Sequence, residues 1–407
     1  MINKTRLFNG SCFALITTAF SFSIRAGILA QLGKEYGFTA EQLGTINQMW
    51  FLGFPISMIV GGLIYHTVGA KKIMQFALFA HGVGILSTIF SGGSYIVLLL
   101  STLLIGLGNG CTEAACNPMI ADTYEGTTMS KMLNRFHMWF PGGIVIGALI
   151  SKFLTDAGAS WQTQIWVIMI PTLIYAYLFW GQEFPKSKIK AATSLSENFK
   201  AMLSPLFLFM FVCMALTAIS EFGPQQWIDL ILGKSGANPM FLLALTTGTM
   251  AVARYFAGPI VHKIDQTGVL LISAVLAAIG LYMYSSMTGN ILYLAAIIYA
   301  CGIAYFWPNM LGFVAEKIPA SGAFGMSVIG GIGMFSSSIF QPIIGKWIDN
   351  SRAEQEAAGL TGDALELAAG QATLSTMVLF PGILIIAFAI LYLWMRNRKT
   401  SATAAAH

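Results

Sequence analysis

The chain has 407 residues, of which 56% are hydrophobic and 10% are charged, and its formal net charge is +5 at pH 7. Soluble domains carry about 25% charged residues, so this composition excludes an ordinary soluble enzyme or binding module and indicates an integral membrane protein. The Lys and Arg residues are spread over short polar connections, so the positive charge does not indicate nucleic-acid binding.

Apolar segments recur along the whole chain at about 20 residues, the length with which an α-helix crosses hydrocarbon. A polar connection, 182–201, divides them into two sets of six. We therefore expect an N-terminal bundle over 1–181, a cytoplasmic linker over 182–201 and a C-terminal bundle over 202–407. The twelve predicted spans lie near 10–32, 43–65, 72–91, 95–119, 131–154, 162–181, 202–231, 238–261, 268–287, 291–314, 322–346 and 372–395.

Most of the 22 Lys and Arg residues fall on one side of this predicted topology. The positive-inside rule makes that side cytoplasmic and places both termini there. The last outer loop, 347–371, is acidic. We expect a multi-pass protein of the bacterial inner membrane. The five cysteines lie in apolar segments and are interpreted as packing residues rather than disulfides.

A single arginine, Arg25, lies inside the first predicted span. A charge at that depth costs about 2.5–3.5 kcal/mol on insertion scales, so it must face protein or a water-filled cavity. A carboxylate, Glu113, lies in the fourth span in the same way. Two buried and opposite charges in an otherwise apolar chain indicate a polar translocation pathway.

The connection between the second and third spans, 62–72, is echoed by the connection between the eighth and ninth, 258–268. Each has a Gly at the helix end, a His four residues later and then a turn Gly, and internal repeats are typical of secondary transporters. The first connection resembles the signature of the major facilitator superfamily, Gly-x-Leu-Ala-Asp-Arg-x-Gly-Arg-Lys, and differs from it at the acidic position, where His66 stands. The resemblance implies an all-α membrane fold of twelve transmembrane helices in two pseudo-symmetric six-helix bundles. The matching residues are Gly62, Gly69, Lys71 and Lys72.

The fourth span, over 106–118, is similar to the Gly-x-x-x-x-Glu-x-x-x-Asn-Pro pattern of the fucose–galactose–glucose proton symporters, and Asn134 also fits that pattern. This resemblance implies that Glu113 takes part in substrate binding and proton coupling, and it points to a sugar or sugar derivative as substrate. The family's Asn-Asp pair in the first span is replaced here by 24–26, which contains Arg25. A first-span Arg with a fourth-span Glu resembles the organic-anion branch of the superfamily, where the Arg pairs a substrate carboxylate and the Glu carries the proton.

Further polar residues of the first six spans are candidates for the substrate site. His137 is suited to proton transfer and shares a helix face with Asn134, although a packing role is the alternative. Asn47 and Gln48 in the second span, with Asn117 in the fourth, are candidate substrate ligands, although polar contacts between helices are the alternative.

In the last six spans, Gly223-Pro224 is expected to break the seventh span, and Trp307-Pro308-Asn309 the tenth, because broken helices line transport sites. Amides can bind hydroxyl groups and an indole can stack on a sugar ring. The candidate substrate ligands there are Gln225, Gln226, Trp227, Tyr305, Trp307 and Asn309.

Four charged residues are expected at cytoplasmic helix ends, where they would form gating ion pairs. They are Lys72 and Asp122 in the first half and Arg254 and Glu316 in the second.

We interpret the chain as a secondary active transporter that moves a small hydrophilic solute by alternating access. A proton is the expected coupling ion, with sodium as the alternative, and the protein is expected to be a monomer in contact with lipid. The sequence carries no catalytic, metal-binding or nucleotide-binding pattern, so we expect no enzyme activity, cofactor or metal. An organic-anion carrier, for example of a sugar acid, is the alternative, and a drug exporter is less favoured.

Overall fold

The structure is a computed structural model that describes residues 2–186, 195–256 and 264–404, and these residues are mostly helical. The first bundle contains α1 (Lys4–Tyr36), α2 (Ala40–Val68), α3 (Ala70–Ile89), α4 (Tyr95–Thr123), α5 (Gly126–His137), α6 (Trp139–Asp156) and α7 (Trp161–Phe179). The second contains α8 (Leu195–Met202), α9 (Pro205–Leu232), α10 (Pro239–Tyr255), α12 (Gln266–Ser286), α13 (Ile291–Ile303), α14 (Phe306–Lys317), α15 (Gly322–Ala357), α16 (Gly362–Met377) and α17 (Leu379–Ala404).

Within the described ranges, eleven helical segments are long and apolar enough to cross a membrane, which confirms the predicted fold class. The predicted fifth, tenth and twelfth spans are each made of two consecutive helices. The predicted eighth span corresponds to α10, which has 17 residues and ends close to 257–263. Those residues lie outside the described part of the chain, and so does most of the second copy of the predicted repeat, 258–268.

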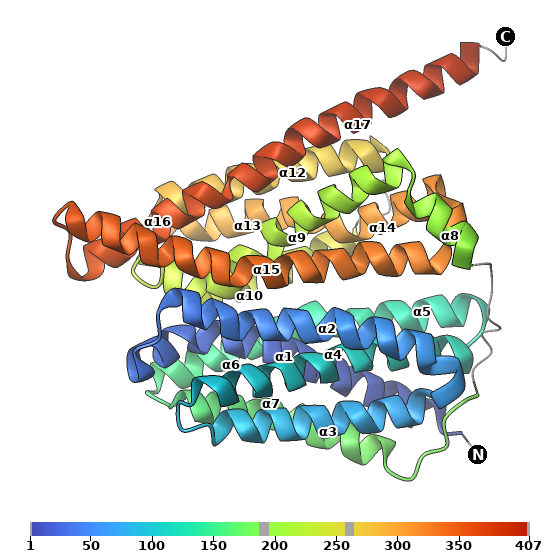
Figure 1. Ribbon diagram of the computed structural model, residues 1–407, viewed down its shortest axis with the longest axis horizontal. Coiled ribbons are helices and arrows are strands. Elements are labelled where there is room, and N and C mark those ends of the chain that lie inside the picture. The colour runs from blue at the N-terminus through green and yellow to red at the C-terminus, as the bar shows by residue number, and fades with distance from the viewer. Residues whose placement is uncertain (1, 187–194, 257–263, 405–407) are drawn as a thin grey trace.

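Helices α1–α7 lie together on one side of the molecule and α8–α17 on the other (Figure 1). The N-terminus, α5, α8 and the end of α17 lie at one end, which we call the terminal face. The α1–α2 turn at 37–39 and the α15–α16 turn at 358–361 lie at the opposite end, which we call the distal face. The two bundles meet where α2 packs along α15, α6 along α10 and α1 along α9.

Glycines allow the closest approach between the bundles. A Cβ atom added to Gly44 on α2 would overlap the backbone carbonyl of Gln341 on α15, and one added to Gly345 would overlap the carbonyl of Ala40. Small residues of this kind let helix backbones pack tightly where lipid provides no hydrophobic driving force. The distal ends of α2 and α15 are therefore in direct contact.

The prediction of a loop over 347–371 is wrong for most of its length. Helix α15 continues to Ala357 and α16 begins at Gly362. The acidic residues there are stabilised within a helical hairpin, because Arg352 donates to Glu366 at 2.7 Å. A helical hairpin that lies outside the membrane and a polar loop are both rich in charged residues. Hydropathy alone therefore does not distinguish them.

The predicted break at Gly223-Pro224 is also wrong, since α9 is continuous through it. Proline has no N–H, so it leaves the carbonyl four residues earlier without its helical partner. For Pro224 that carbonyl belongs to Ser220, and the hydroxyl of Tyr299 on α13 donates to it at 2.6 Å. The helix continues because another helix supplies the missing donor.

The predicted break in the tenth span is confirmed, because α13 ends at Ile303 and α14 begins at Phe306. The carbonyl that Pro308 leaves without a partner is that of Ala304, and the Nε atom of Arg254 on α10 donates to it at 2.8 Å. Side chains from neighbouring helices thus satisfy the carbonyls freed by both prolines.

Candidate functional site

Arg25 lies where the two bundles meet, and its side chain is only 6% exposed. Its Nε atom donates to Oδ1 of Asn47 on α2 at 2.5 Å. Its Nη2 atom donates to Oε1 of Gln226 on α9 at 2.9 Å, and the amide of Gln226 donates in turn to the carbonyl of Phe22. Three predicted site residues from three helices and both bundles therefore form one cluster.

Aromatic rings cover this cluster. The guanidinium carbon of Arg25 lies 4.9 Å from the ring centre of Trp50 and 6.0 Å from that of Phe51. Ring contacts at 5.7 Å join Phe51 to Phe222 of the second bundle, and contacts at 6.2 Å join Phe222 to Trp307. We call these five groups the aromatic layer: Phe22, Trp50, Phe51, Phe222 and Trp307.

Arg25 has unused capacity to bind an anion. A guanidinium carries five N–H donors, and the described residues accept bonds from only two of its nitrogens, both through neutral amides. Within the described chain Arg25 forms no ion pair with a carboxylate. The Nδ2 atom of Asn47 is buried and also has no partner among the described residues. The site therefore presents a positive charge and free donors next to aromatic faces.

A chain of buried hydrogen bonds supports the aromatic layer from behind. The indole N–H of Trp50 donates to Ser21 on α1 at 2.9 Å, and the amide of Asn109 on α4 donates to the same hydroxyl at 3.2 Å. Asn109 contacts Nε2 of His81 on α3 at 2.9 Å, and Nδ1 of His81 contacts the hydroxyl of Tyr175 on α7 at 2.9 Å. Sequence analysis did not assign these hydrogen-bonded residues to the site. The indication in the sequence is the presence of polar residues at 81 and 109 inside apolar spans.

Glu113 lies half-buried on α4 and does not form an ion pair with Arg25. Its Oε2 atom accepts a hydrogen bond from Asn117, one turn later, at 2.6 Å. The structure thus brings two predicted residues, Glu113 and Asn117, together in a second polar position of the first bundle. The Oδ1 atom of Asn117 is buried without a partner in the part of the chain that is described.

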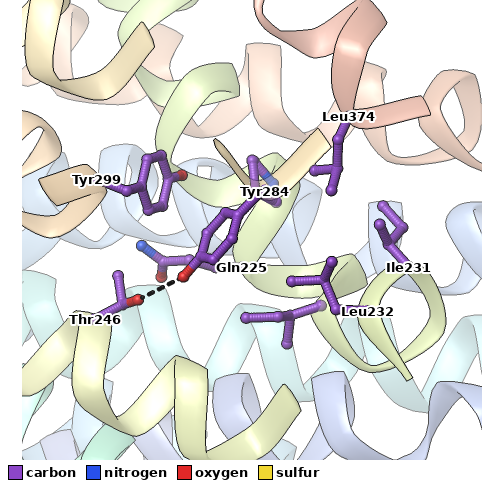
Figure 2. A pocket seen from close by; sticks show the side chains of 9 residues that line it. Gln225, Ile231, Leu232, Thr246, Tyr284, Tyr299 and Leu374 are labelled. Carbon is purple, nitrogen blue, oxygen red and sulfur yellow. Dashed lines mark hydrogen bonds between the residues drawn. The ribbon is translucent and has the colours of Figure 1, made fainter. Parts of the chain in front are cut away.

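Gln225 and Gln226 are adjacent in sequence but point to different places. Gln225 lines a small pocket inside the second bundle, beside Thr246, Tyr284 and Tyr299 (Figure 2). Its amide contacts the sulfur of Met250 at 3.8 Å. Consecutive residues of a helix are separated by about 100° around its axis, so only one of the two amides reaches Arg25.

Two of the remaining candidates of the second bundle, Tyr305 and Asn309, are hydrogen-bonded to backbone carbonyls. The hydroxyl of Tyr305 donates to the carbonyl of Ala253 at 2.8 Å, and the amide of Asn309 donates to the carbonyl of Tyr305 at 3.0 Å. Trp227 is fully buried, and its indole N–H has no partner among the described residues. Of these candidates, Trp307 extends the aromatic layer.

Two predicted residues of the first bundle, His137 and Gln48, form no hydrogen bond with Arg25 within the described chain. His137 is exposed at the end of α5, with its ring 5.0 Å from that of Phe136. The side chain of Asn134 lies outside the described residues. Gln48 is half-buried, and its backbone carbonyl accepts a bond from Ser338 of α15 at 3.1 Å.

The structure gives contacts for three of the four predicted gating residues, and their gating role stays a prediction. Asp122 accepts a hydrogen bond from Tyr65 at 2.8 Å, Glu316 pairs with its neighbour Lys317 at 2.5 Å, and Lys72 is exposed. Arg254 lies 3.8 Å from Glu221 on α9. Arg254 itself lies in the last turn of α10, and its carboxylate partner lies in the middle of α9.

A buried polar cluster where two bundles of membrane-length helices meet is the arrangement expected of a membrane transporter. The family model of the Major Facilitator Superfamily matches residues 11–342, and the chain belongs to this family. It is therefore a secondary transporter and not an enzyme.

Relatives of known function are transporters as well. The 3-(3-hydroxy-phenyl)propionate transporter of Escherichia coli strain K12 is 25% identical over 412 residues, which cover 96% of this chain and 94% of that protein. The hexuronate transporter of Bacillus subtilis strain 168 is 27% identical over 175 residues, covering 41% of this chain and 39% of that protein.

Solved structures of similar fold include the nucleoside transporter NupG, with a TM-score of 0.77 at 14% identity, covering 96% of this chain and 100% of that one. A bacterial homologue of the lysosomal transporter Spinster, described as inward-facing and unoccupied, gives a TM-score of 0.76 at 16% identity and 97% coverage of both chains.

Proposed function

We propose that this transporter carries a small organic acid and that Arg25 binds the substrate's carboxylate. The observation that carries this proposal is the buried guanidinium with unused donors and no carboxylate partner within the described chain. A buried charge is unfavourable unless it is paired, and a substrate carboxylate would supply the pair. Arginine is suited to this role because its planar fork can bind a carboxylate through two parallel hydrogen bonds.

The surroundings of Arg25 support an acid with a flat, apolar body. The aromatic layer offers ring faces directly beside the guanidinium, and such faces favour an aromatic ring or the apolar face of a cyclic compound. Two relatives are named for organic acids, one aromatic and one a sugar acid. We favour an aromatic acid because the amides nearest to Arg25 are already engaged with it.

A neutral sugar is the second candidate. The resemblance of the fourth span to the fucose–galactose–glucose proton symporters supports it, together with the amides at positions 47 and 226. In this structure, however, those amides accept bonds from Arg25, which leaves fewer of their groups for hydroxyls. A neutral substrate would also leave the charge of Arg25 unpaired.

We propose further that transport is coupled to protons, that the terminal face is cytoplasmic and that the protein resides in the bacterial inner membrane. The concentration of Lys and Arg toward the terminal face supports this orientation. Glu113 is a candidate proton carrier of the first bundle, because its carboxylate lies half-buried and, among the described residues, an amide is its only hydrogen-bond donor.

Substrate binding to purified protein can test the role of Arg25. Titrations with 3-phenylpropionate, a hexuronate and a neutral hexose should show binding of an acid and none of the hexose. Arg25→Lys keeps the charge but removes the fork, so the affinity for the acid should fall at least about tenfold. Arg6→Lys is the matched control, because the side chain of Arg6 donates to backbone carbonyls of 177–180 near the terminal face. Its affinity should equal that of the wild type.

The opposite pattern would overturn the proposal. If the hexose binds, if Arg25→Lys is tolerated and if Asn309→Ala weakens binding, the substrate is a neutral sugar. If the double variant Arg25→Met/Glu113→Gln binds as tightly as the wild type, Arg25 serves only to balance a charge.

A further inference from the structure

Glu221 is a buried carboxylate that the proposed site at Arg25 does not use. It lies in the middle of α9 and is 5% exposed. Its nearest cationic group is Nη2 of Arg254, 3.8 Å from Oε1, close to the limit for a salt bridge. No described residue donates a hydrogen bond to either oxygen of this carboxylate. Buried carboxylates in proteins are normally paired and hydrogen-bonded, so the charged form of Glu221 is poorly compensated here.

Arg254 is close to Glu221 but is held by another group. Its Nε atom donates to the carbonyl of Ala304 at 2.8 Å, at the break between α13 and α14. This bond satisfies the carbonyl that Pro308 leaves without a helical partner. Arg254 therefore has two negative neighbours, the carboxylate of Glu221 and the carbonyl of Ala304. The carbonyl of Ala304 is the closer of the two.

Other ionisable groups around Glu221 do not neutralise it. The hydroxyl of Tyr299 on α13 donates to the backbone carbonyls of Ser220, at 2.6 Å, and Glu221, at 3.1 Å, and not to the carboxylate. Tyr284 on α12 faces Thr246. Within the described chain, the hydrogen bond of Arg25 to α9 is to Gln226. The Asp, Glu, Lys and Arg residues of α14, α15, α16 and α17 lie toward the ends of those helices.

We propose that Glu221 is a proton-binding site of the second bundle, separate from Glu113, and that it controls how Arg254 is shared between α9 and the broken α13–α14 helix. A proton that binds to the carboxylate cancels its negative charge. Arg254 then keeps only its bond to the carbonyl of Ala304. When the proton leaves, the ionised carboxylate attracts Arg254 toward α9.

The position of Glu221 on α9 links this proton site to the proposed substrate site. Gln226, which contacts Arg25, lies five residues beyond Glu221 on the same helix, and Pro224 lies between them. A shift of Arg254 toward or away from α9 acts on the segment that carries Gln226. The second bundle would thereby bind the proton while the first bundle binds the anion. This inference deepens the proposed proton-coupled function and rests on it.

Infrared difference spectroscopy of purified protein without substrate tests the proposal directly. Lowering the pH from about 9 to about 5 should produce the carbonyl stretch of a newly protonated carboxylic acid. The component of this band that arises from Glu221 should be absent in the Glu221→Gln variant. It should be present in Glu113→Gln, which is the matched control. In Arg254→Gln the same component should appear at higher pH, because the cation that opposes proton binding is gone while the glutamine amide can still donate to the Ala304 carbonyl.

An unchanged band in Glu221→Gln would overturn the proposal, and so would a component that keeps its midpoint in Arg254→Gln. If Glu221→Gln alone does not fold, the double variant Glu221→Gln/Arg254→Gln replaces both charges and should fold, because removing one member of a buried pair costs more than replacing both. The double variant should lack the same component. Because no substrate is present, this result is independent of whether Arg25 binds an acid.

Discussion

The carboxylate of Asp349 on α15 accepts a hydrogen bond from the backbone N–H of Ala40, at the first turn of α2, with a distance of 3.0 Å. Its second oxygen accepts from the next N–H, that of Glu41, at 2.8 Å. The first N–H groups of a helix have no partner within the helix, and an anion there also interacts favourably with the helix dipole. Asp349 thus caps a helix of the opposite bundle and joins the two bundles at the distal face.

Removal of this cap should loosen the distal face. Asp349→Ala should cost about 1 kcal/mol, the usual cost of a lost helix cap, and should speed hydrogen exchange at the amides of Ala40 and Glu41 about fivefold. Mass spectrometry of the peptide over 37–46 measures this exchange. Asp363→Ala is the control, because the ion pair of Asp363 with Lys234 at 2.8 Å is exposed and contributes little. Equal exchange rates in Asp349→Ala and wild type would show that the cap does not hold the bundles together.

Gln341 should limit the stability of this conformation. It is 0% exposed, and neither atom of its side-chain amide has a hydrogen-bond partner among the described residues. Buried polar groups without partners cost about 1–3 kcal/mol, so Gln341→Leu should raise the melting temperature and slow the conformational cycle of transport. Thermal unfolding in detergent and the rate of substrate counterflow measure the two effects.

A glutamine with a partner should respond in the opposite direction. Gln371 donates to the carbonyl of Met287 at 3.2 Å, so Gln371→Leu should lower the melting temperature. If both variants shift the melting temperature in the same direction, the unpaired amide of Gln341 is not the cause.

Tyr299 should be needed only because Pro224 lacks an N–H. Tyr299→Phe leaves the carbonyl of Ser220 without a donor and should destabilise the protein by about 1 kcal/mol. Pro224→Ala provides an N–H for that carbonyl within the helix. Tyr299→Phe should therefore cost less stability when it is introduced into the Pro224→Ala variant than when it is introduced into the wild type. Thermal or denaturant unfolding of the four proteins measures this coupling, and strictly additive effects would contradict the explanation.

Gln226 should orient Arg25 for the substrate. It accepts from Arg25 and donates to the carbonyl of Phe22, so Gln226→Leu removes both the acceptor and its anchor. The affinity for the organic acid should fall about tenfold, or about 1.4 kcal/mol. Titration calorimetry measures the change. Gln225→Leu is the matched control on the neighbouring position, and its affinity should stay within about twofold of the wild type. Equal losses in the two variants would indicate a general disturbance of α9.

The membrane class, most of the spans and the presence of a buried charge could be predicted from local sequence. Spans are predictable because about 20 consecutive apolar residues have no other stable location than hydrocarbon. Arg25 could be identified for a related reason. A charge inside such a segment is costly in hydrocarbon, so it must face protein or a water-filled cavity. The break near Pro308 was also predictable, but the same argument failed at Pro224, because Tyr299 of a distant helix supplies the donor there.

The membership of the site was decided by tertiary structure. Adjacent glutamines have the same chemistry in sequence, yet only Gln226 reaches Arg25, because the packing of α9 against α1 fixes which side of the helix faces the first bundle. The sequence also did not indicate that Arg254 would donate to the carbonyl of Ala304 beside Glu221. Periodicity and hydropathy determine which segments cross the membrane, since these depend on each segment alone. Partners of polar groups depend on which helices lie side by side, and only the folded arrangement of both bundles determines that.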